Sequence, residues 1–303
     1  MKKKLLAALL AALLTLSAAC ALAQGVTVTD MYDREVVLDA PVTRIVALTA
    51  ADCEILCALG GESLLVGRGQ YCDYPESILS VPVVQSGAET NIEEILALAP
   101  QVVLMGDMAQ SQEQVSQLEQ NGVRVVISDA NDIAGTYTAI RMIGALTGLD
   151  DAAAALIDDM QATFAQVAAE SENSGKTVYF EVSPLQYGLW TAGKNTFMDE
   201  LAALCGLTNA FADVDGWASI SEEQVLARDP DYIVTTAMYY GVGDTPVDEI
   251  ISRPGWDQLK AVKNGCVYNA DSNAVSRPGP RLKDAVLELY NFVNGAQEEI
   301  SAA

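Results

Sequence analysis

The amino-acid sequence predicts an α/β protein of two Rossmann-like lobes with parallel sheets, joined by a long rigid α-helix. Short apolar runs alternate with helix-periodic segments at 44–127, and again at 177–294. The stretch between them is rich in alanine, carries apolar residues at helical spacing and has no glycine- or proline-rich run. This alternation is typical of parallel strands that helices cover on both faces. We therefore expect a clamshell whose two halves are held by helix.

The first 23 residues have the layout of an export signal. Lys2–Lys4 precede the apolar run Leu5–Leu16, and small residues follow. The run is too short to span a bilayer comfortably, so we expect a signal peptide at 1–23 and an exported protein at the cell surface or in the periplasm. The segment ending at Cys20 resembles a lipobox. Acylated Cys20 would anchor the chain to the outer face of the cytoplasmic membrane, and cleavage after Ala23 is the alternative.

Composition excludes several classes of function. The chain has 17 Lys and Arg against 41 Asp and Glu, a net charge of −24. Such a field repels phosphate backbones, so we expect no nucleic-acid partner. Histidine is absent, which excludes Ser-His-Asp and Cys-His catalysis together with His-ligated zinc and haem. We accordingly expect a protein that is not an enzyme and that carries no cofactor and no resident metal.

Cysteine spacing leaves several states open. The six cysteines are Cys20, Cys53, Cys57, Cys72, Cys205 and Cys266. Cys53 and Cys57 are four residues apart on a predicted helix and would share a face. With Cys72 they could form a soft-metal site, although no CxxC pair is present. We favour the interpretation that these cysteines are small buried hydrophobic residues or form one disulfide, and the pairing stays open.

The first lobe is expected at 26–131. Residues 26–39 alternate apolar and polar around the turn at 30–34, which predicts a hairpin. Thr49 precedes a helix-periodic run that Gly60 and Gly61 end, as an N-cap and a stop signal would. Further along we expect strands at 44–48, 64–66, 102–105 and 123–127, and helices at 50–59, 91–99 and 111–121.

Linking helices are expected at 132–174 and the second lobe at 175–295. One helix runs from Asp132 to a stop at Gly148, and a second from 150 to 172 has an apolar stripe of Leu156, Met160, Phe164 and Val167 that we interpret as core. In the second lobe we expect strands at 177–182, 232–235 and 266–268, and helices at 196–204, 221–227, from 248 and from 280 to about 294. Ligands of such folds bind in the crevice at the carboxyl ends of the strands.

Several short segments, taken in order, resemble one family. They are Val28–Val36, Pro41–Val46, Leu59–Gly61 leading to Val66 and Gly67, Cys72–Pro75, Asn91–Pro100, Gly193 and Lys194, Trp217, Glu222–Pro230 and Ser276–Arg281. Their order and spacing resemble the iron-chelate and cobalamin family of periplasmic binding proteins, in the class with a helical linker between its domains. The resemblance implies a monomeric binding component of an ABC importer. It would capture a metal chelate, with a ferric siderophore ahead of cobalamin, and deliver it to the permease dimer and its ATPase.

The resemblance also places two docking residues. Glu93 and Glu223 match positions where each lobe of the family presents a carboxylate to arginines of the permease. Two separated charges of this kind steer and orient docking more than they add affinity. Both glutamates also begin predicted helices, where the macrodipole favours a negative charge, so a purely local role is the alternative.

The expected ligand-binding residues come partly from the resemblance and partly from their segments. The resemblance points to Tyr71, Trp217 and Arg277, because aromatic faces suit a large flat chelate and arginine suits its oxygens. Thr49 begins the first helix, whose free N–H groups could meet an anionic ligand. Four aromatics lie on segments that should also face the gap, although each could instead pack between the lobes: Tyr187, Trp190, Tyr239 and Tyr240.

Two departures weaken cobalamin relative to a siderophore. Gly106 and Asp107 stand where a cobalamin pocket would offer an aromatic, and Tyr290 stands where such a protein can carry a cysteine partner for the one matching Cys205. Ferric hydroxamate, catecholate, haem bound through tyrosine, and corrinoid all stay open. A ligand-sensing surface lipoprotein without transport is an alternative, and a chelatase-like enzyme is disfavoured because such sites usually need histidine.

Overall fold

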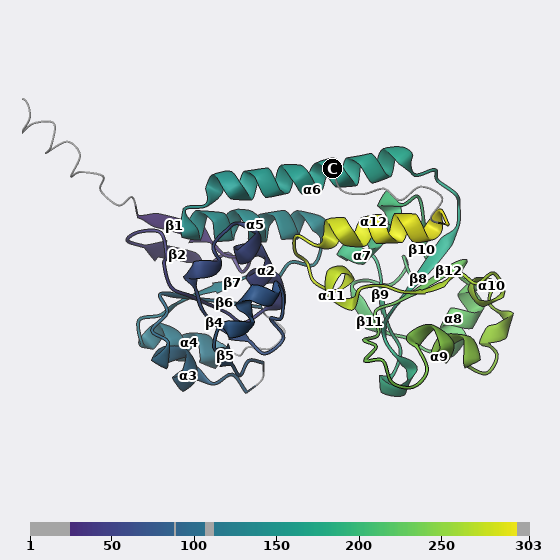
Figure 1. The fold of residues 1–303 in the computed structure, drawn as a ribbon, viewed down its shortest axis with the longest axis horizontal. Helices are drawn as coiled ribbons and strands as arrows, with labels where there is room; N and C mark the ends of the chain where they lie inside the picture. Colours follow the sequence, from purple (N-terminus) through teal and green to yellow (C-terminus); the bar gives the residue numbers. More distant parts are fainter. Residues whose placement is uncertain (1–24, 88, 107–111, 296–303) are drawn as a thin grey trace, which may run out of the picture.

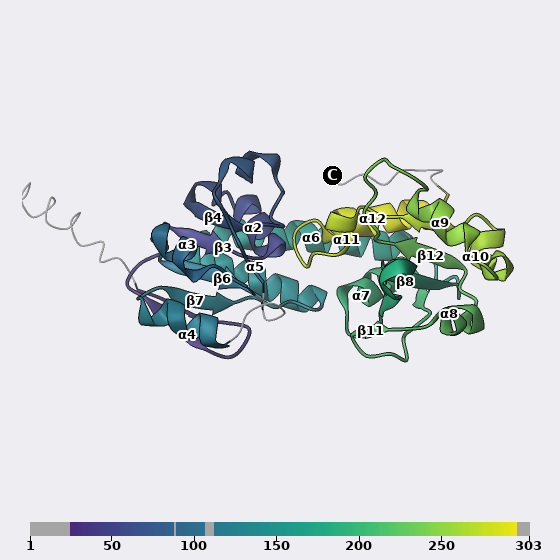
Figure 2. The same cartoon turned by 90° about the horizontal axis from the view of Figure 1, so that it is seen from below.

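The structure is a computed structural model that describes residues 25–87, 89–106 and 112–295. The expected signal peptide and Cys20 lie outside the described residues. Two α/β lobes stand side by side, and one long helix, α6 (Asp150–Glu170), runs across both of them (Figures 1 and 2). This arrangement matches the fold class that the sequence predicts. Within the described ranges, no helix is both long and apolar enough to cross a membrane.

Lobe one is built on a parallel sheet of five strands. In sheet order these are β5 (Val83–Val84), β4 (Leu65–Gly69), β3 (Ile45–Ala47), β6 (Val102–Met105) and β7 (Arg124–Ile127). All four residues of β6 are buried, as expected for a strand covered on both faces. The covering segments are α2 (Ala50–Ala58), α3 (Ile92–Ala97), α4 (Gln112–Gln120) and the 3₁₀ turns η1 (Glu62–Leu64) and η2 (Glu76–Ser80).

The predicted hairpin precedes this sheet and packs against it. Strands β1 (Val26–Thr29) and β2 (Glu35–Leu38) pair antiparallel, with Val26 opposite Leu38. The buried Asp30 carboxylate holds the turn, because it accepts hydrogen bonds from the backbone N–H groups of Tyr32 and Arg34 at 3.0 Å each. The same carboxylate accepts the N–H of Ile127 at 3.1 Å, so the hairpin is tied to the end of β7.

Lobe two has a mixed sheet, which corrects the expectation of a purely parallel one. The order is β11 (Trp217–Ser219), β9 (Trp190–Ala192), β8 (Thr177–Ser183), β12 (Tyr232–Thr235) and β13 (Val267–Asn269), and β10 (Thr208–Asn209) also pairs with β8. Strands β9 and β11 run antiparallel to their neighbours. They escape sequence analysis because each is three residues long and lacks an apolar run.

Helices and 3₁₀ turns surround the second sheet. They are η4 (Leu185–Tyr187), α7 (Phe197–Leu204), α8 (Glu222–Arg228), α9 (Pro246–Ser252), η5 (Trp256–Gln258), α10 (Lys260–Lys263), α11 (Ser272–Val275) and α12 (Leu282–Val293). Helix α8 begins with the capping box that its sequence indicates, in which the Ser221 hydroxyl accepts from Gln224 N–H and the Gln224 side chain accepts from Ser221 N–H.

The linking helices belong to the core of both lobes. Helix α5 (Ile133–Thr147) packs on β1, α2 and α6, and α6 continues onto α7 and α12 of lobe two. One hydrophobic cluster includes Ile143 of α5, Met160 of α6 and Val286 of α12. The predicted stripe of α6 is buried except at Leu156, which is half-buried, while Ile157 takes the buried position. Because both lobes share this packing, a large hinge motion would have to expose core side chains.

Close packing of α5 against α6 depends on a glycine. An added Cβ at Gly144 would lie 2.7 Å from the Cβ of Ala153, well inside van der Waals contact. Gly144→Val should therefore force the two helices apart and lower the free energy of unfolding by about 1–3 kcal/mol. Urea unfolding measures this loss. Ala155→Val, on the exposed face of α6, is the matched control, and an equal loss in both variants would contradict the packing role.

Candidate functional site

A cavity of about 670 Å³ lies between the two lobes. Lobe one contributes the start of α2 and the residues just after β6 and β7, while lobe two contributes the end of β8, strands β9 and β11, and the start of α7. The turn that contains Arg277 and Pro278 completes the wall. Thr49, Gly106 and Ser128 each follow a parallel strand, so the cavity lies where the carboxyl ends of a parallel sheet meet.

A second cavity of about 810 Å³ lies in lobe two beside the first. Both cavities are lined by Val182 and Ser276, so they adjoin, and we refer to the two together as the candidate cleft. Of the residues expected to contact ligand, Thr49, Trp190, Trp217 and Arg277 line the cavity between the lobes. Tyr187, Tyr239 and Tyr240 line the second cavity. Tyr71 lies outside both linings, on the loop at 70–75 with 71% of its surface exposed.

The two tryptophans of the cleft are held by the antiparallel strands that sequence analysis missed. Trp190 pairs with Ser219 across β9 and β11, and Trp217 pairs with Ala192. The Trp217 ring packs against Phe197 with 5.4 Å between ring centroids. About two fifths of the surface of each tryptophan is exposed, 42% for Trp190 and 36% for Trp217. Such rings offer flat apolar surface at low cost in conformational entropy.

Carboxylates dominate the charge of the cleft. Lining residues include Asp52 and Asp129 between the lobes, and Glu181, Asp244 and Glu249 in the second cavity. Among the described residues that line the two cavities, the one cationic side chain is Arg277. Sequence analysis missed the five acids, because a lone Asp or Glu in a loop or first helical turn usually has a local role.

Glu181 is buried and paired with an arginine behind the cavity wall. Arg253 donates from Nη1 to Glu181 Oε2 at 2.7 Å and from Nη2 to Oε1 at 2.9 Å, a bidentate contact. It also donates from Nε to Glu249 Oε1 at 3.0 Å, and its guanidinium lies over the Trp256 ring at 4.4 Å. Burial raises the pKa of Glu181, and the bonds from Arg253 oppose that rise.

Asp52 is the most perturbed acid of the cleft. Its side chain is fully buried in the first turn of α2, and the Thr49 hydroxyl donates to its Oδ2 at 2.5 Å. Burial raises the pKa of Asp52 to about 6, against the lowering effect of hydrogen bonds with Thr49 and Ser128. A carboxylate held this way in a cleft is typical of a functional position rather than of one selected for stability.

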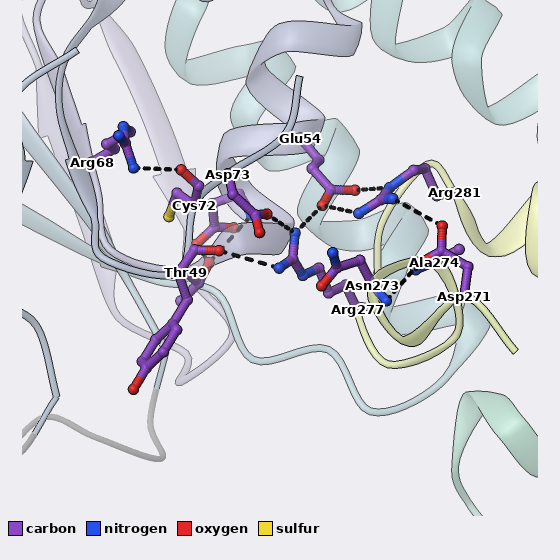
Figure 3. A network of polar contacts seen from close by, with 12 residues as sticks. Thr49, Glu54, Arg68, Cys72, Asp73, Asp271, Asn273, Ala274, Arg277 and Arg281 are labelled. Atoms are coloured by element: carbon purple, nitrogen blue, oxygen red, sulfur yellow. Dashed lines mark hydrogen bonds and ion pairs between the residues drawn. The ribbon is translucent and has the colours of Figure 1, made fainter. Parts of the chain in front are cut away.

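An ion network joins the lobes beside the cavity, and we call its four residues, Glu54, Asp73, Arg277 and Arg281, the interlobe clamp (Figure 3). Arg281 of lobe two donates from Nε to Glu54 Oε2 at 2.8 Å and from Nη2 to Oε1 at 2.7 Å. Arg277 donates from Nη1 to Glu54 Oε1 and to Asp73 Oδ1, both at 2.8 Å. Glu54 is buried on α2, so one carboxylate of lobe one holds two arginines of lobe two.

The clamp reaches the loop that carries Tyr71. Arg277 donates from Nη2 to the Tyr71 carbonyl at 3.2 Å, and the Arg281 guanidinium lies over the Tyr74 ring at 4.2 Å. Arg277 therefore lines the cavity, as expected, but its guanidinium is already engaged by two carboxylates and a carbonyl. Its contact with ligand stays a prediction.

The two expected docking glutamates are exposed and lie in different lobes. Glu93 is in the first turn of α3 and Glu223 in the first turn of α8. Both helices lie on the side of the molecule away from α6 (Figure 1). A hydrogen bond with the Ser221 side chain lowers the pKa of Glu223. The placement is compatible with docking and also with a local capping role, so docking stays a prediction.

Known proteins share both the sequence pattern and the fold. The model of a family described as periplasmic binding protein matches residues 45–274. An uncharacterized ABC transporter substrate-binding lipoprotein of Bacillus subtilis is 33% identical over 88% of this chain and 85% of its own. The vitamin B12-binding protein of Salmonella typhi is 31% identical over 83% of this chain and 90% of its own. A periplasmic heme binding protein from Pseudomonas aeruginosa, solved as a crystal structure, superimposes with a TM-score of 0.77 at 26% identity, over 86% and 96% of the two chains.

Removing the shared carboxylate of the clamp should destabilise the protein. Glu54→Gln would leave two arginines facing each other without their buried counter-charge, and we expect a loss of about 3 kcal/mol in the free energy of unfolding. Urea unfolding followed by tryptophan fluorescence measures it. Asp73→Asn is the matched control, because the Asp73 side chain is half exposed and should cost less than about 1 kcal/mol. Similar small losses in both variants would contradict the central role of Glu54.

Asp52 should make stability depend on pH. Its pKa is about 6 in the folded protein against an ordinary 3.8, so the folded state binds the proton more tightly than the unfolded state does. The contribution of Asp52 to the free energy of unfolding is therefore lost as pH rises from about 4 to 6. Asp52→Asn removes the titration. Relative to wild type, the variant should gain about 2 kcal/mol between pH 4.5 and pH 7.5, measured by urea unfolding. The exposed Asp151→Asn variant should show the same pH dependence as wild type. A difference in free energy of unfolding between Asp52→Asn and wild type that stays constant with pH would refute the raised pKa of Asp52.

Proposed function

This chain belongs to the periplasmic binding protein family, and we propose that it captures a corrinoid such as cobalamin for import. It is an extracytoplasmic substrate-binding component of an ABC transporter, so its partners are a permease and a small ligand. The family is one of binding proteins, which confirms the expectation that the chain is not an enzyme and removes the chelatase-like alternative. We also propose that acylated Cys20 tethers the chain to the outer face of the cytoplasmic membrane, which the similarity to a substrate-binding lipoprotein supports.

The charge of the side chains that line the cleft is the main support for this choice of ligand. The described lining of the cleft has five carboxylates, of which Glu181 and Glu249 share one cation, Arg253, and its one arginine is already engaged within the interlobe clamp. An anionic ligand, such as a ferric catecholate or a haem with its propionates, would bring negative charge against these carboxylates without a free cation to meet it. A neutral ligand rich in N–H donors would instead offer hydrogen bonds that carboxylates accept.

A corrinoid has this chemistry. Its macrocycle is broad and flat, and its rim carries amide groups. Trp190 and Trp217 lie on one sheet of lobe two and would pack against one face of the macrocycle, while Asp129 and Asp244 would accept hydrogen bonds from its amides. Relatives that bind vitamin B12 or cobalamin add support, since they match this chain over 83–88% of its length. The sequence alone places a ferric siderophore ahead of cobalamin because of Gly106, Asp107 and Tyr290, and we propose the opposite order on the charge of the cleft.

The remaining expected residues find roles within this proposal. Thr49 would present the N-terminus of α2 to a polar group of the ligand, and Tyr71 would lie at the outer rim. Tyr187, Tyr239 and Tyr240 would contact whatever part of the ligand reaches the second cavity. An uncharged or cationic ferric hydroxamate shares the favoured charge and is the second candidate.

A binding comparison tests the ligand. The mature chain, produced without lipid, is titrated with cyanocobalamin, a ferric hydroxamate, a ferric catecholate and hemin, and the quenching of tryptophan fluorescence is followed. We expect a Kd of about 1 µM or below for cyanocobalamin, about −8 kcal/mol. Trp190→Ala should weaken it at least about tenfold. Tyr32→Ala, an exposed aromatic on the hairpin turn, should not. Tightest binding of the catecholate or of hemin would overturn the proposal.

Docking is tested separately from ligand binding. Glu93→Lys combined with Glu223→Lys should abolish ligand uptake by cells, because the two charges that orient the lobes on the permease are reversed. The Kd for ligand should stay within about twofold, since neither residue lines the cleft. Glu113→Lys, at an exposed first-turn position of α4, is the matched control. Normal uptake by the double variant would contradict docking through Glu93 and Glu223.

A further inference from the structure

Two buried thiols meet beneath the loop at 70–75. Cys53 is on α2 and Cys72 is in the loop, and neither has any exposed surface. The Sγ atoms of both lie 3.7 Å from one acceptor, the carbonyl oxygen of Ala47. Cys57, one turn further along α2, is half-buried, and Cys205 and Cys266 lie in lobe two.

The thiols also contact each other. A hydrogen bond with the Cys72 thiol is the main reason that the pKa of Cys53 is well above its ordinary value, and burial raises it further. Burial likewise raises the pKa of Cys57 to about 11. In the folded protein Cys53 and Cys57 are therefore thiols rather than thiolates, and Cys53 reacts slowly until the loop opens.

The loop that contains Cys72 contacts both the sheet of lobe one and the interlobe clamp. Arg68, buried on β4, donates from Nη1 to the Cys72 carbonyl at 2.8 Å (Figure 3). It also donates from Nε to the Ile78 carbonyl at 3.1 Å. The next residue, Asp73, belongs to the interlobe clamp, and the preceding residue offers its carbonyl to Arg277. A bond that fixes Cys72 would therefore also fix Tyr71 and Asp73, the two loop residues that contact Arg277.

We propose that Cys53 and Cys72 are a modification site at which an oxidant closes a disulfide that staples the 70–75 loop to α2. Extracytoplasmic compartments supply disulfide oxidants. One thiolate attacks a sulfur of the oxidant disulfide and releases one thiol from it, and the second thiolate then attacks the mixed disulfide and releases the other. Two protons and two electrons leave the protein, and one S–S bond forms.

The staple has a definite structural consequence. It closes a chain segment of twenty residues that includes β4 and Arg68, and it restricts that segment in the unfolded state. It also removes the local opening by which the loop could release Asp73 from Arg277. The oxidised protein should therefore keep the clamp formed at temperatures where the reduced protein loses it.

Peptide mapping tests the linkage in the whole mature chain. The protein is incubated with oxidised glutathione during refolding, denatured in N-ethylmaleimide, digested without reductant and analysed by mass spectrometry. We expect a linked peptide that joins Cys53 to Cys72, two hydrogen masses below the sum of its parts, and alkylated Cys57, Cys205 and Cys266. Recovery of both Cys53 and Cys72 as alkylated thiols, or linkage of Cys72 to Cys57, would overturn the proposal.

Thermal unfolding gives a second readout. It compares oxidised and reduced samples of the same protein, so it does not depend on how well a variant folds. Oxidised wild type should melt about 5 °C above the same sample treated with dithiothreitol. Cys57→Ser, the matched control on the same helix, should keep that difference. Cys53→Ala and Cys72→Ala should each melt at one temperature with or without reductant. A reductant effect that survives in Cys53→Ala would contradict the assignment.

Discussion

One buried carboxylate determines how the two halves of this protein meet. Glu54 lies on α2 of lobe one and receives both Arg277 and Arg281 from the turn before α12. A charge taken out of water is tolerated when its partners are close and its lone pairs are satisfied, and here short hydrogen bonds fulfil both conditions. Because Arg277 also lines the cavity, the contact that joins the lobes is part of the wall of the candidate site.

A second constraint comes from the linking helices. Helices α5 and α6 carry one hydrophobic cluster from the hairpin of lobe one to α12 of lobe two. The clamp and this shared core together fix the two lobes relative to each other, so a ligand meets walls that are largely preformed. Preformed walls lower the ordering cost of binding, and small rearrangements of exposed groups such as Trp190 and Tyr240 are then sufficient.

The electrostatics of the cleft differ from those that a metal-chelate family suggests in general. In the described lining of the cleft a single engaged arginine stands among five carboxylates, and burial raises the pKa of Asp52 to about 6. Carboxylates in such a site repel anionic ligands and attract ligands that carry hydrogen-bond donors, and both effects contribute to specificity. Specificity for a neutral, donor-rich molecule would then follow from charge, while the tryptophans contribute affinity with little discrimination.

Much of this protein was determined by local sequence alone. The strands at 102–105 and 232–235, the caps of the helices and the apolar stripe of α6 follow from periodicity and from turn residues, because these depend on neighbours in the chain. The short strands β9 and β11, the pairing of Glu54 with arginines more than two hundred residues away, and the meeting of Cys53 with Cys72 came only from the tertiary structure. Ion pairs and thiol contacts between distant segments leave no periodic signal, since a lone charge or cysteine looks the same in sequence whether or not a partner folds against it.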